Sequence, residues 1–246
     1  MARYDFNAQR LFVEADLAEG ATVACGAEQA NYLRNVLRLG PGDAILVFNG
    51  RDGEWQAELA EAGKRGATLA VRRRTRPQEA GPDIDYLFAP LKRARLDYMA
   101  QKATEMGVAR LRPVMTRRTT PERVNTLRMR ANAIEAAEQC GILRIPEVHE
   151  PERLDRVIAG WDAARTLVFC DEGSEEKDPL AALARAKRGP LALLVGPEGG
   201  FEEGERELVA CKPFVVRISL GPRILRADTA AIAALALVNA ALGDWR

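Results

Sequence analysis

The chain has 246 residues, of which 47% are hydrophobic and 29% are charged, and its formal net charge at pH 7 is +1. This apolar content predicts one large or two small packed domains and argues against a disordered chain. The sequence has no secretory signal and no apolar run long enough to span a bilayer, so we expect a soluble cytoplasmic protein with no membrane partner.

Cysteine and histidine usage excludes the common metal and disulfide classes. The four cysteines are far apart and form no CxxC pair, and His149 is the only histidine. A disulfide framework, a zinc site and a two-histidine metal site are therefore not expected. We interpret His149 as a surface or loop residue beside Glu147 and Glu150.

Residues 1–76 read mostly as strands. Apolar or alternating runs predict strands at 10–13, 44–48, 54–60 and 67–73. Asn49-Gly50 and Gly53 form a hairpin signal, because glycine readily adopts positive φ. One amphipathic helix, with its apolar side drawn from Tyr32 to Leu39, interrupts the strands. We expect a small β-barrel, a fold that often binds nucleic acid on one face.

A linker at 77–83 separates this barrel from a second domain at 84–246. Apolar runs predict strands at 84–89, 108–115, 166–170, 191–195 and 214–220. Helical patterns fall between them, including one that starts at Pro121, ends at Cys140 and turns Leu127, Ala131, Ile134 and Ala137 inward. Alternating strands and helices predict a parallel sheet covered on both faces.

The last predicted helix, 229–242, is apolar nearly all round, with Asn239 its one polar side chain past the first turn. Such a helix must be buried on most sides. It belongs either in the core or at a subunit interface, and we favour the interface because the helix would otherwise expose a large apolar patch.

Positive charge is concentrated between Lys92 and Arg130, where eleven Lys and Arg residues face three Asp and Glu residues. Such a local field can steer a polyanion even when the net charge is near zero. These residues could instead form solvated helix faces. We favour nucleic acid, because Arg110, Arg112, Arg117 and Arg118 crowd one strand end and loop.

Two glycine-proline loops carry the strongest functional signal. One runs from Leu193 to Phe201 and the other from Ile218 to Arg226, and each follows an apolar run that predicts a buried strand. Ligands of open α/β sheets bind outside the carboxyl ends of strands. Neither GxGxxG nor GxxxxGK[ST] occurs, which argues against a Rossmann dinucleotide site and a phosphate-binding loop.

Together, and in this order, the motifs resemble the RsmE family of ribosomal RNA methyltransferases. The matching segments share the family's order along nearly the whole chain and are 36–39 with 42–43, 101–108, 135–141, 194–201 and 220–226. Two positions depart from the family pattern. Ile142 follows Cys140-Gly141 where the family has arginine, and Asp228 stands where it often has glutamate. Asp228 can also be read as the N-cap of the last helix.

The resemblance implies an α/β fold of the SPOUT class, with a trefoil-knotted parallel-sheet domain at the C-terminus and a PUA-like β-barrel at the N-terminus. It implies a homodimer joined through the C-terminal domain. The implied activity is transfer of a methyl group from S-adenosyl-L-methionine to uridine N3 in small-subunit (16S) ribosomal RNA, with no metal.

Candidate site residues follow from this resemblance together with the residue types. Peptide groups and apolar walls for the cofactor come from Leu194, Gly196, Gly199, Gly200, Ile218, Leu220 and Leu225. The candidate catalytic residues are Arg223, Arg226 and Glu198, and we favour the arginines. Arg223 could instead bind an RNA phosphate, Arg226 could pair with Asp228, and Glu198 could cap the helix that starts near Phe201. The RNA-binding candidates are Arg10, Arg34, Arg38, Lys92, Arg93, Arg117 and Arg118.

Two other functions remain open on the sequence. The chain could be a non-enzymatic RNA-binding or ribosome-assembly protein whose glycine loops are inert turns. It could also be a nucleotide-dependent oxidoreductase, although the glycine spacing argues against this.

Overall fold

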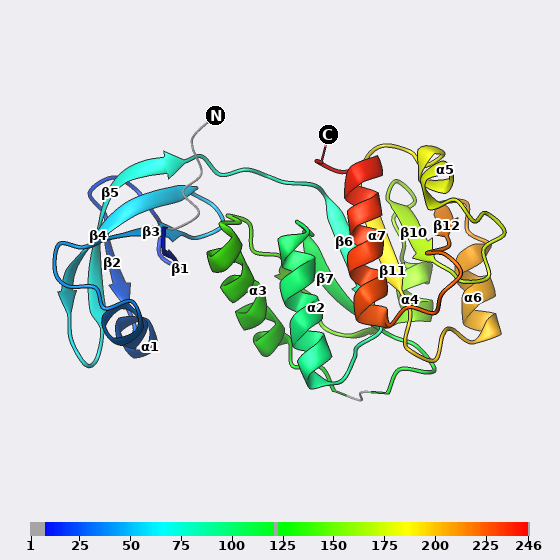
Figure 1. The fold of residues 1–246 in the computed structure, drawn as a ribbon, viewed down its shortest axis with the longest axis horizontal. Helices are drawn as coiled ribbons and strands as arrows, with labels where there is room; N and C mark the ends of the chain where they lie inside the picture. The colour runs from blue at the N-terminus through cyan, green and yellow to red at the C-terminus, as the bar shows by residue number, and fades with distance from the viewer. Residues whose placement is uncertain (1–7, 121–122, 246) are drawn as a thin grey trace. The chain divides into compact units, whose positions relative to one another are not determined.

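The computed structural model describes residues 8–120 and 123–245. It separates into two compact units (Figure 1). The first comprises Met1–Ala80 and Ala137–Ile145, and the second comprises Gly81–Ala136 and Pro146–Arg246. The segment 137–145, which the sequence places in the second domain, therefore clusters with the first unit.

The first unit is built on a mixed five-stranded sheet with the order β1-β3-β4-β5-β2. Its strands are β1 (Arg10–Phe12), β2 (Thr22–Cys25), β3 (Ala44–Phe48), β4 (Glu54–Ala62) and β5 (Ala67–Arg76). β1 runs parallel to β3, and the other pairs are antiparallel. Four strands were predicted, whereas β2 was missed because only two of its four residues are buried.

The helix predicted at 32–39 begins and ends earlier in the chain and is less regular than expected. An α-helix, α1 (Ala27–Asn31), leads into a π-helical segment, η1 (Tyr32–Val36). The Leu37 N–H donates to the Tyr32 carbonyl at 2.9 Å, which is an i to i+5 bond. Arg38 follows with a φ of 58°, a left-handed conformation that is uncommon for a residue with a side chain.

The second unit contains a parallel sheet with the order β12-β10-β11-β6-β7-β8, and β9 pairs separately with β7. Its strands are β6 (Ile84–Phe88), β7 (Arg110–Met115), β8 (Glu147–Val148), β9 (Glu152–Arg153), β10 (Thr166–Cys170), β11 (Leu191–Val195) and β12 (Val215–Ile218). Every residue of β6 and β11 is buried. This explains why β11 reads as a continuous apolar run in the sequence and why β6 is apolar except at Asp85.

Helices cover both faces of this sheet, as predicted. They are α2 (Arg93–Glu105), α3 (Thr126–Cys140), α4 (Leu154–Ala159), α5 (Pro179–Ala184), α6 (Glu203–Ala210) and α7 (Ala227–Ala241). Side chains of α2, α5 and α7 share one core cluster, and those of α4 and α6 share the other (Figure 1). In the part of the chain that the structure describes, no helix is long and apolar enough to cross a membrane.

The predicted inward face of α3 is partly wrong. Leu127 is 81% exposed, and Ala131 is exposed as well. The buried side chains include Met129 and Ala133, four residues apart, so the helix turns a different stripe inward. Pro121, which was predicted to begin this helix, lies outside the described residues.

The last helix, α7, packs one face on the core. Ala230, Ala234 and Val238 are buried along this face, and the Asn239 side-chain amide donates to the Met106 carbonyl at 2.9 Å. Ala233 and Ala236 are only half-buried, and Ala240 is exposed. The helix thus presents small apolar side chains on its other face.

Candidate functional site

Sheet topology brings the two glycine-proline loops to one edge of the second unit. β11 and β12 each pair in parallel with β10, so all three strands end at the same edge. Strands in a sheet lie about 4.8 Å apart, which separates the ends of β11 and β12 by about 10 Å. The first loop (196–202), the second loop (219–226) and the loop after β10 (171–178) therefore emerge side by side.

The first loop is a rigid turn packed on the sheet. A Cβ on Gly196 would lie 2.4 Å from the Phe201 ring, so only glycine allows that ring to pack where it does. The Phe201 ring in turn packs edge-on against Phe169 with centroids 5.1 Å apart. Gly200 has a φ of 71°, and its N–H closes a turn by donating to the Pro197 carbonyl at 2.9 Å. Loop geometry and core packing are thus coupled.

Arginines from neighbouring elements hold the first loop. Arg118 donates from Nη1 to the Gly199 carbonyl at 2.7 Å, and Arg95 forms an ion pair with Glu198. The main-chain N–H of Arg117 donates to Glu205 at 2.9 Å. Arg95 was not predicted. Its partner lies 103 residues away along the chain, so no local pattern indicates the pair.

The helix after the first loop is capped by Glu202, not by Glu198. The Glu202 side chain accepts from the N–H three residues on, and Glu205 accepts from the Glu202 N–H at 3.2 Å, which completes a capping box. The alternative in which Glu198 caps this helix is therefore wrong. Glu198 remains half-exposed beside the loop, in contact with Arg95.

The second loop is open to solvent. Gly221 has a φ of 94°, and a Cβ built on it would meet nothing within 4 Å. Arg223 and Arg226 are exposed, whereas Leu220 and Leu225 are half-buried and pack against the core. This loop therefore combines bare backbone, apolar walls and two exposed positive charges.

Arg226, not Asp228, occupies the N-cap position of α7. Asp228 lies within the first turn and accepts from the Thr229 N–H at 2.9 Å. The N-cap interpretation of Asp228 is therefore wrong. A carboxylate in the first turn still interacts favourably with the helix dipole.

The loop after β10 is anchored by a buried carboxylate that sequence reasoning missed. Asp171 is 4% exposed. It accepts from Arg206 Nε at 2.9 Å, from Arg217 Nε at 2.7 Å and from the Gly173 N–H at 3.0 Å. Burial opposes ionisation of Asp171, but these hydrogen bonds outweigh it and hold the pKa of Asp171 below its ordinary value.

The side chains of the predicted cofactor residues Leu194 and Ile218 are fully buried in the core. Any ligand at this edge of the sheet can meet these two residues only through their main-chain atoms. The cofactor candidates on the loops are Gly196, Gly199, Gly200, Leu220 and Leu225. Together, the seven residues belong to strands β11 and β12 and the loops that follow them, and thus to one edge of the sheet.

Most predicted RNA-binding side chains are exposed. In the second unit, Lys92 and Arg93 stand at the start of α2, and Arg117 and Arg118 follow β7. α2 follows β6, so these side chains belong to loops at the same edge as the glycine-proline loops. In the first unit, Arg34 and Arg38 are exposed on and after η1.

Arg10 differs from the other candidates. Its side chain is 2% exposed, and its Nε lies 2.9 Å from the buried carboxylate of Glu54. Arg76 and Thr75 also bond Glu54, at 2.8 Å each. Burial opposes ionisation, yet the hydrogen bonds from Arg76, Thr75 and Arg10 keep the pKa of Glu54 below its ordinary value. We therefore remove Arg10 from the RNA-binding candidates, because its guanidinium group is buried and paired with Glu54.

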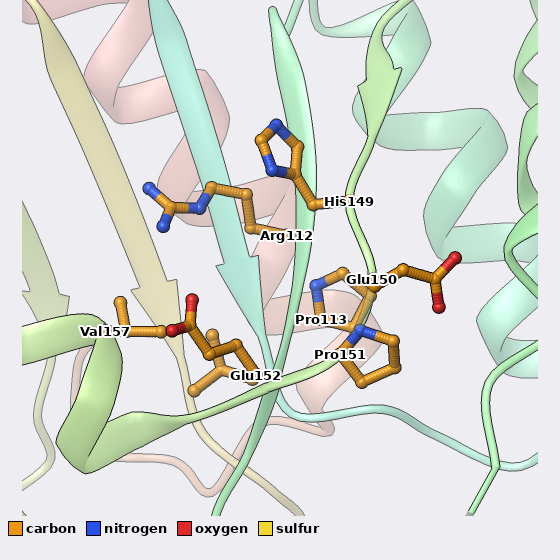
Figure 2. A pocket seen from close by; sticks show the side chains of 8 residues that line it. Arg112, Pro113, His149, Glu150, Pro151, Glu152 and Val157 are labelled. Atoms are coloured by element: carbon orange, nitrogen blue, oxygen red, sulfur yellow. The ribbon is translucent and has the colours of Figure 1, made fainter.

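A separate pocket of about 310 Å³ lies beside β7, β8, β9 and α4 (Figure 2). Arg112, His149 and Glu152 are among its lining residues. Arg112 is engaged by Asp85 at 3.1 Å and lies over the Trp161 ring at 5.9 Å. His149 Nε2 lies 3.5 Å from Glu147, which agrees with its predicted place beside acidic residues. None of the glycine-proline loop residues lines this pocket.

No group of three or more His, Cys, Asp or Glu residues suited to hold a metal ion occurs within residues 8–120 and 123–245.

Comparison with known proteins gives matches to both units. Residues 78–239 match the model of an RNA methyltransferase domain, and residues 25–72 match an RNA methyltransferase PUA domain. The ribosomal RNA small subunit methyltransferase E of Synechocystis is 31% identical over 96% of this chain and 78% of its own. The protein of the same name from Rickettsia conorii is 29% identical over 94% of each chain.

Two solved structures are similar over nearly the whole chain. The ribosomal RNA small subunit methyltransferase E of Neisseria gonorrhoeae, solved bound to S-adenosyl methionine, has a TM-score of 0.88 and 27% identity, and covers 98% of this chain and 100% of its own. A Legionella pneumophila protein, solved with bound SAM, has a TM-score of 0.85 and 28% identity over 97% of this chain and 99% of its own.

Proposed function

This chain belongs to the RsmE family of ribosomal RNA small subunit methyltransferases, and from that membership we propose that it methylates uridine N3 in 16S ribosomal RNA with S-adenosyl-L-methionine as donor. The observation that carries the proposal is that RNA methyltransferase models match both units, in the order in which the units follow along the chain. The shared edge at the ends of β10, β11 and β12 supports it, because the family's glycine-proline motifs form the loops at that edge.

The loops fit a donor with an adenine ring and a charged amino-acid tail. The backbone at Gly199, Gly200 and Gly221 carries no side chain, so peptide groups can approach a ligand closely. Leu220 and Leu225 offer apolar surface for the faces of the adenine ring, and both pack against the core cluster that contains Ile218. When bound, S-adenosyl-L-methionine supplies a methyl carbon already activated by its sulfonium group.

We assign the acceptor side of the reaction to the second loop. The proton on uracil N3 must leave before or as the methyl arrives, so negative charge develops on the pyrimidine. Arg223 and Arg226 are exposed beside the crevice, and their charges would stabilise that anion. Glu198 already has Arg95 as a partner. We therefore give Glu198 the role of orienting the base through this pair and give the arginines the larger catalytic role.

RNA binding in this proposal uses exposed cations. Lys92, Arg93, Arg117 and Arg118 would grip phosphates near the crevice, and Arg34 and Arg38 would do so on the first unit. Phosphate contacts position a nucleic acid without reading its sequence. The folded RNA of the small subunit would then select the uridine by shape. With such a substrate, the protein would act in the cytoplasm.

We further propose the finer features of the family fold. The C-terminal segment from β11 to α7 would thread into a trefoil knot, and the mixed sheet of the first unit would close as a PUA-like β-barrel. Two copies would associate through the half-buried alanines of α7, which offer a flat apolar face for close helix packing.

The decisive experiment is mass spectrometry of ribosomal RNA nucleosides. Purified protein and S-adenosyl-L-methionine, without added metal, should add 3-methyluridine to small subunits from cells that lack the enzyme. A Gly199→Arg change should abolish this activity and the binding of S-adenosylhomocysteine. A wild-type protein that binds RNA but neither donor nor product would instead support a non-enzymatic assembly protein.

A further inference from the structure

The loop after β10 occupies a central position at the crevice edge. β10 lies between β11 and β12 in the sheet, so the loop 171–178 leaves the sheet between the first and second glycine-proline loops. Neither the motifs nor the candidate residues of the sequence analysis include this loop. A ligand that bridges the two glycine-proline loops must pass over it.

The start of this loop is fixed in place. The Asp171 carboxylate accepts hydrogen bonds from Arg206 and Arg217. The Gly173 carbonyl accepts from the same two arginines, at 3.1 and 2.9 Å. Residue 172 stands between these two anchored residues. Its main chain therefore has little freedom, and its Cβ position is set before any ligand arrives.

The Glu172 carboxylate lies next to the first loop. Its Oε1 is 3.7 Å from the point where a Cβ on Gly200 would stand. Gly200 is the residue whose positive φ exposes bare backbone at the crevice. A ligand in contact with this backbone therefore meets Glu172 as well.

The neighbouring carboxylates already have partners, whereas Glu172 has none within the described parts of the chain. Glu198 pairs with Arg95, Glu203 pairs with Arg206, and Glu205 accepts main-chain N–H groups. Glu172 forms no ion pair or hydrogen bond with any of the residues that the structure describes. It is exposed, so both of its oxygens are available to a ligand.

We propose that Glu172 binds the ribose hydroxyls of the methyl donor and so positions its adenosine group across the loops. This inference rests on the proposed function. A carboxylate accepts from two adjacent hydroxyls at once, and an acidic residue near a glycine turn at a strand end plays that part in dinucleotide sites. Glu172 is a positioning residue, since it touches the donor's sugar and not the reacting carbon.

The test compares Glu172→Gln with Glu175→Gln, which alters an exposed residue of the same loop. Isothermal titration calorimetry measures the Kd of S-adenosylhomocysteine. Displacement titrations then compare adenosine with 2′,3′-dideoxyadenosine. A hydrogen bond to a charged group is worth enough for about a tenfold change in Kd.

We expect Glu172→Gln to weaken S-adenosylhomocysteine about tenfold and to erase most of the preference for adenosine over the dideoxy analogue, while Glu175→Gln changes neither. Without ligand, the wild type and both variants should have the same Tm. Unchanged affinity in Glu172→Gln, or an equal loss for both nucleosides, would overturn the assignment. A wild-type protein that binds no S-adenosylhomocysteine would instead refute the proposed function, so the two failures are distinguishable.

Discussion

Replacing Asp171 with asparagine tests whether the buried carboxylate holds the crevice edge together. The substitution keeps the size of the side chain but removes the charge that accepts from Arg206, Arg217 and the Gly173 N–H at 2.7 to 3.0 Å. Each hydrogen bond to a charged group contributes about 1.5–3 kcal/mol. Because the two arginines are about 30% exposed and can regain water, we expect a total loss of about 2–4 kcal/mol.

The assay is urea unfolding of Asp171→Asn and of the wild type at pH 7, with Asp155→Asn as the matched control. Asp155 pairs with Arg153 on the surface, so its loss should leave the free energy of unfolding nearly unchanged. Asp171→Asn should also weaken S-adenosylhomocysteine binding, because Glu172 would no longer be held in place. If Asp171→Asn proves as mild as the control, the anchoring role is refuted.

The same carboxylate predicts a dependence of stability on pH. Its pKa is lower in the folded protein than in an unfolded chain, so the folded state binds fewer protons. The stabilisation is therefore complete above about pH 4, the value of an unperturbed aspartate, and is lost as the pH falls through the lower folded pKa. In Asp171→Asn, the free energy of unfolding should no longer show this fall at low pH when urea unfolding is measured across the acid range.

Five further substitutions separate packing, catalysis and RNA binding. Gly196→Ala drives a methyl group into an aromatic ring 2.4 Å away and should cost about 1–3 kcal/mol in urea unfolding, whereas Gly204→Ala, where a Cβ meets nothing within 4 Å, should be neutral or stabilising. Arg223→Ala should slow single-turnover methyl transfer about 100-fold or more while the Kd of S-adenosylhomocysteine stays within about twofold; a matching loss of affinity would contradict a role on the acceptor. Arg10→Met should destabilise the first unit by about 1.5–3 kcal/mol, because the buried Glu54 carboxylate loses one charged partner and keeps Arg76 and Thr75. Arg34→Met should leave stability unchanged and lower the salt dependence of RNA binding by about one phosphate contact.

Elements with strong local patterns could be predicted from the sequence. β6 and β11 are buried on both faces; β11 reads as an unbroken apolar run, and β6 is interrupted only by Asp85. The glycine-proline turns also carried their own signal, since Gly200 and Gly221 adopt the positive φ that favours glycine. For α3 the local pattern was ambiguous. Alanines on several sides allow more than one apolar stripe, and the packing, not the sequence, decides that Leu127 faces solvent.

The missed or corrected charged residues share one physical cause. Asp171 meets arginines 35 and 46 residues further along the chain, and Arg10 meets a glutamate 44 residues away. A charged residue in a sequence suggests a solvated side chain, because burial of a charge is costly unless a partner is supplied. Only the folded topology brings those partners together, so neither the anchor at Asp171 nor the burial of Arg10 has a local signature.

The position of β10 in the sheet also affects how the protein is made. This strand is synthesised before both of its neighbours, β11 and β12. During translation the loop after β10 therefore lacks both neighbouring loops until the last fifth of the chain has left the ribosome. At about 5–20 residues per second this delay lasts several seconds. A nascent or truncated chain that stops before β12 has one side of the crevice and no opposite wall, and should be unable to capture the donor.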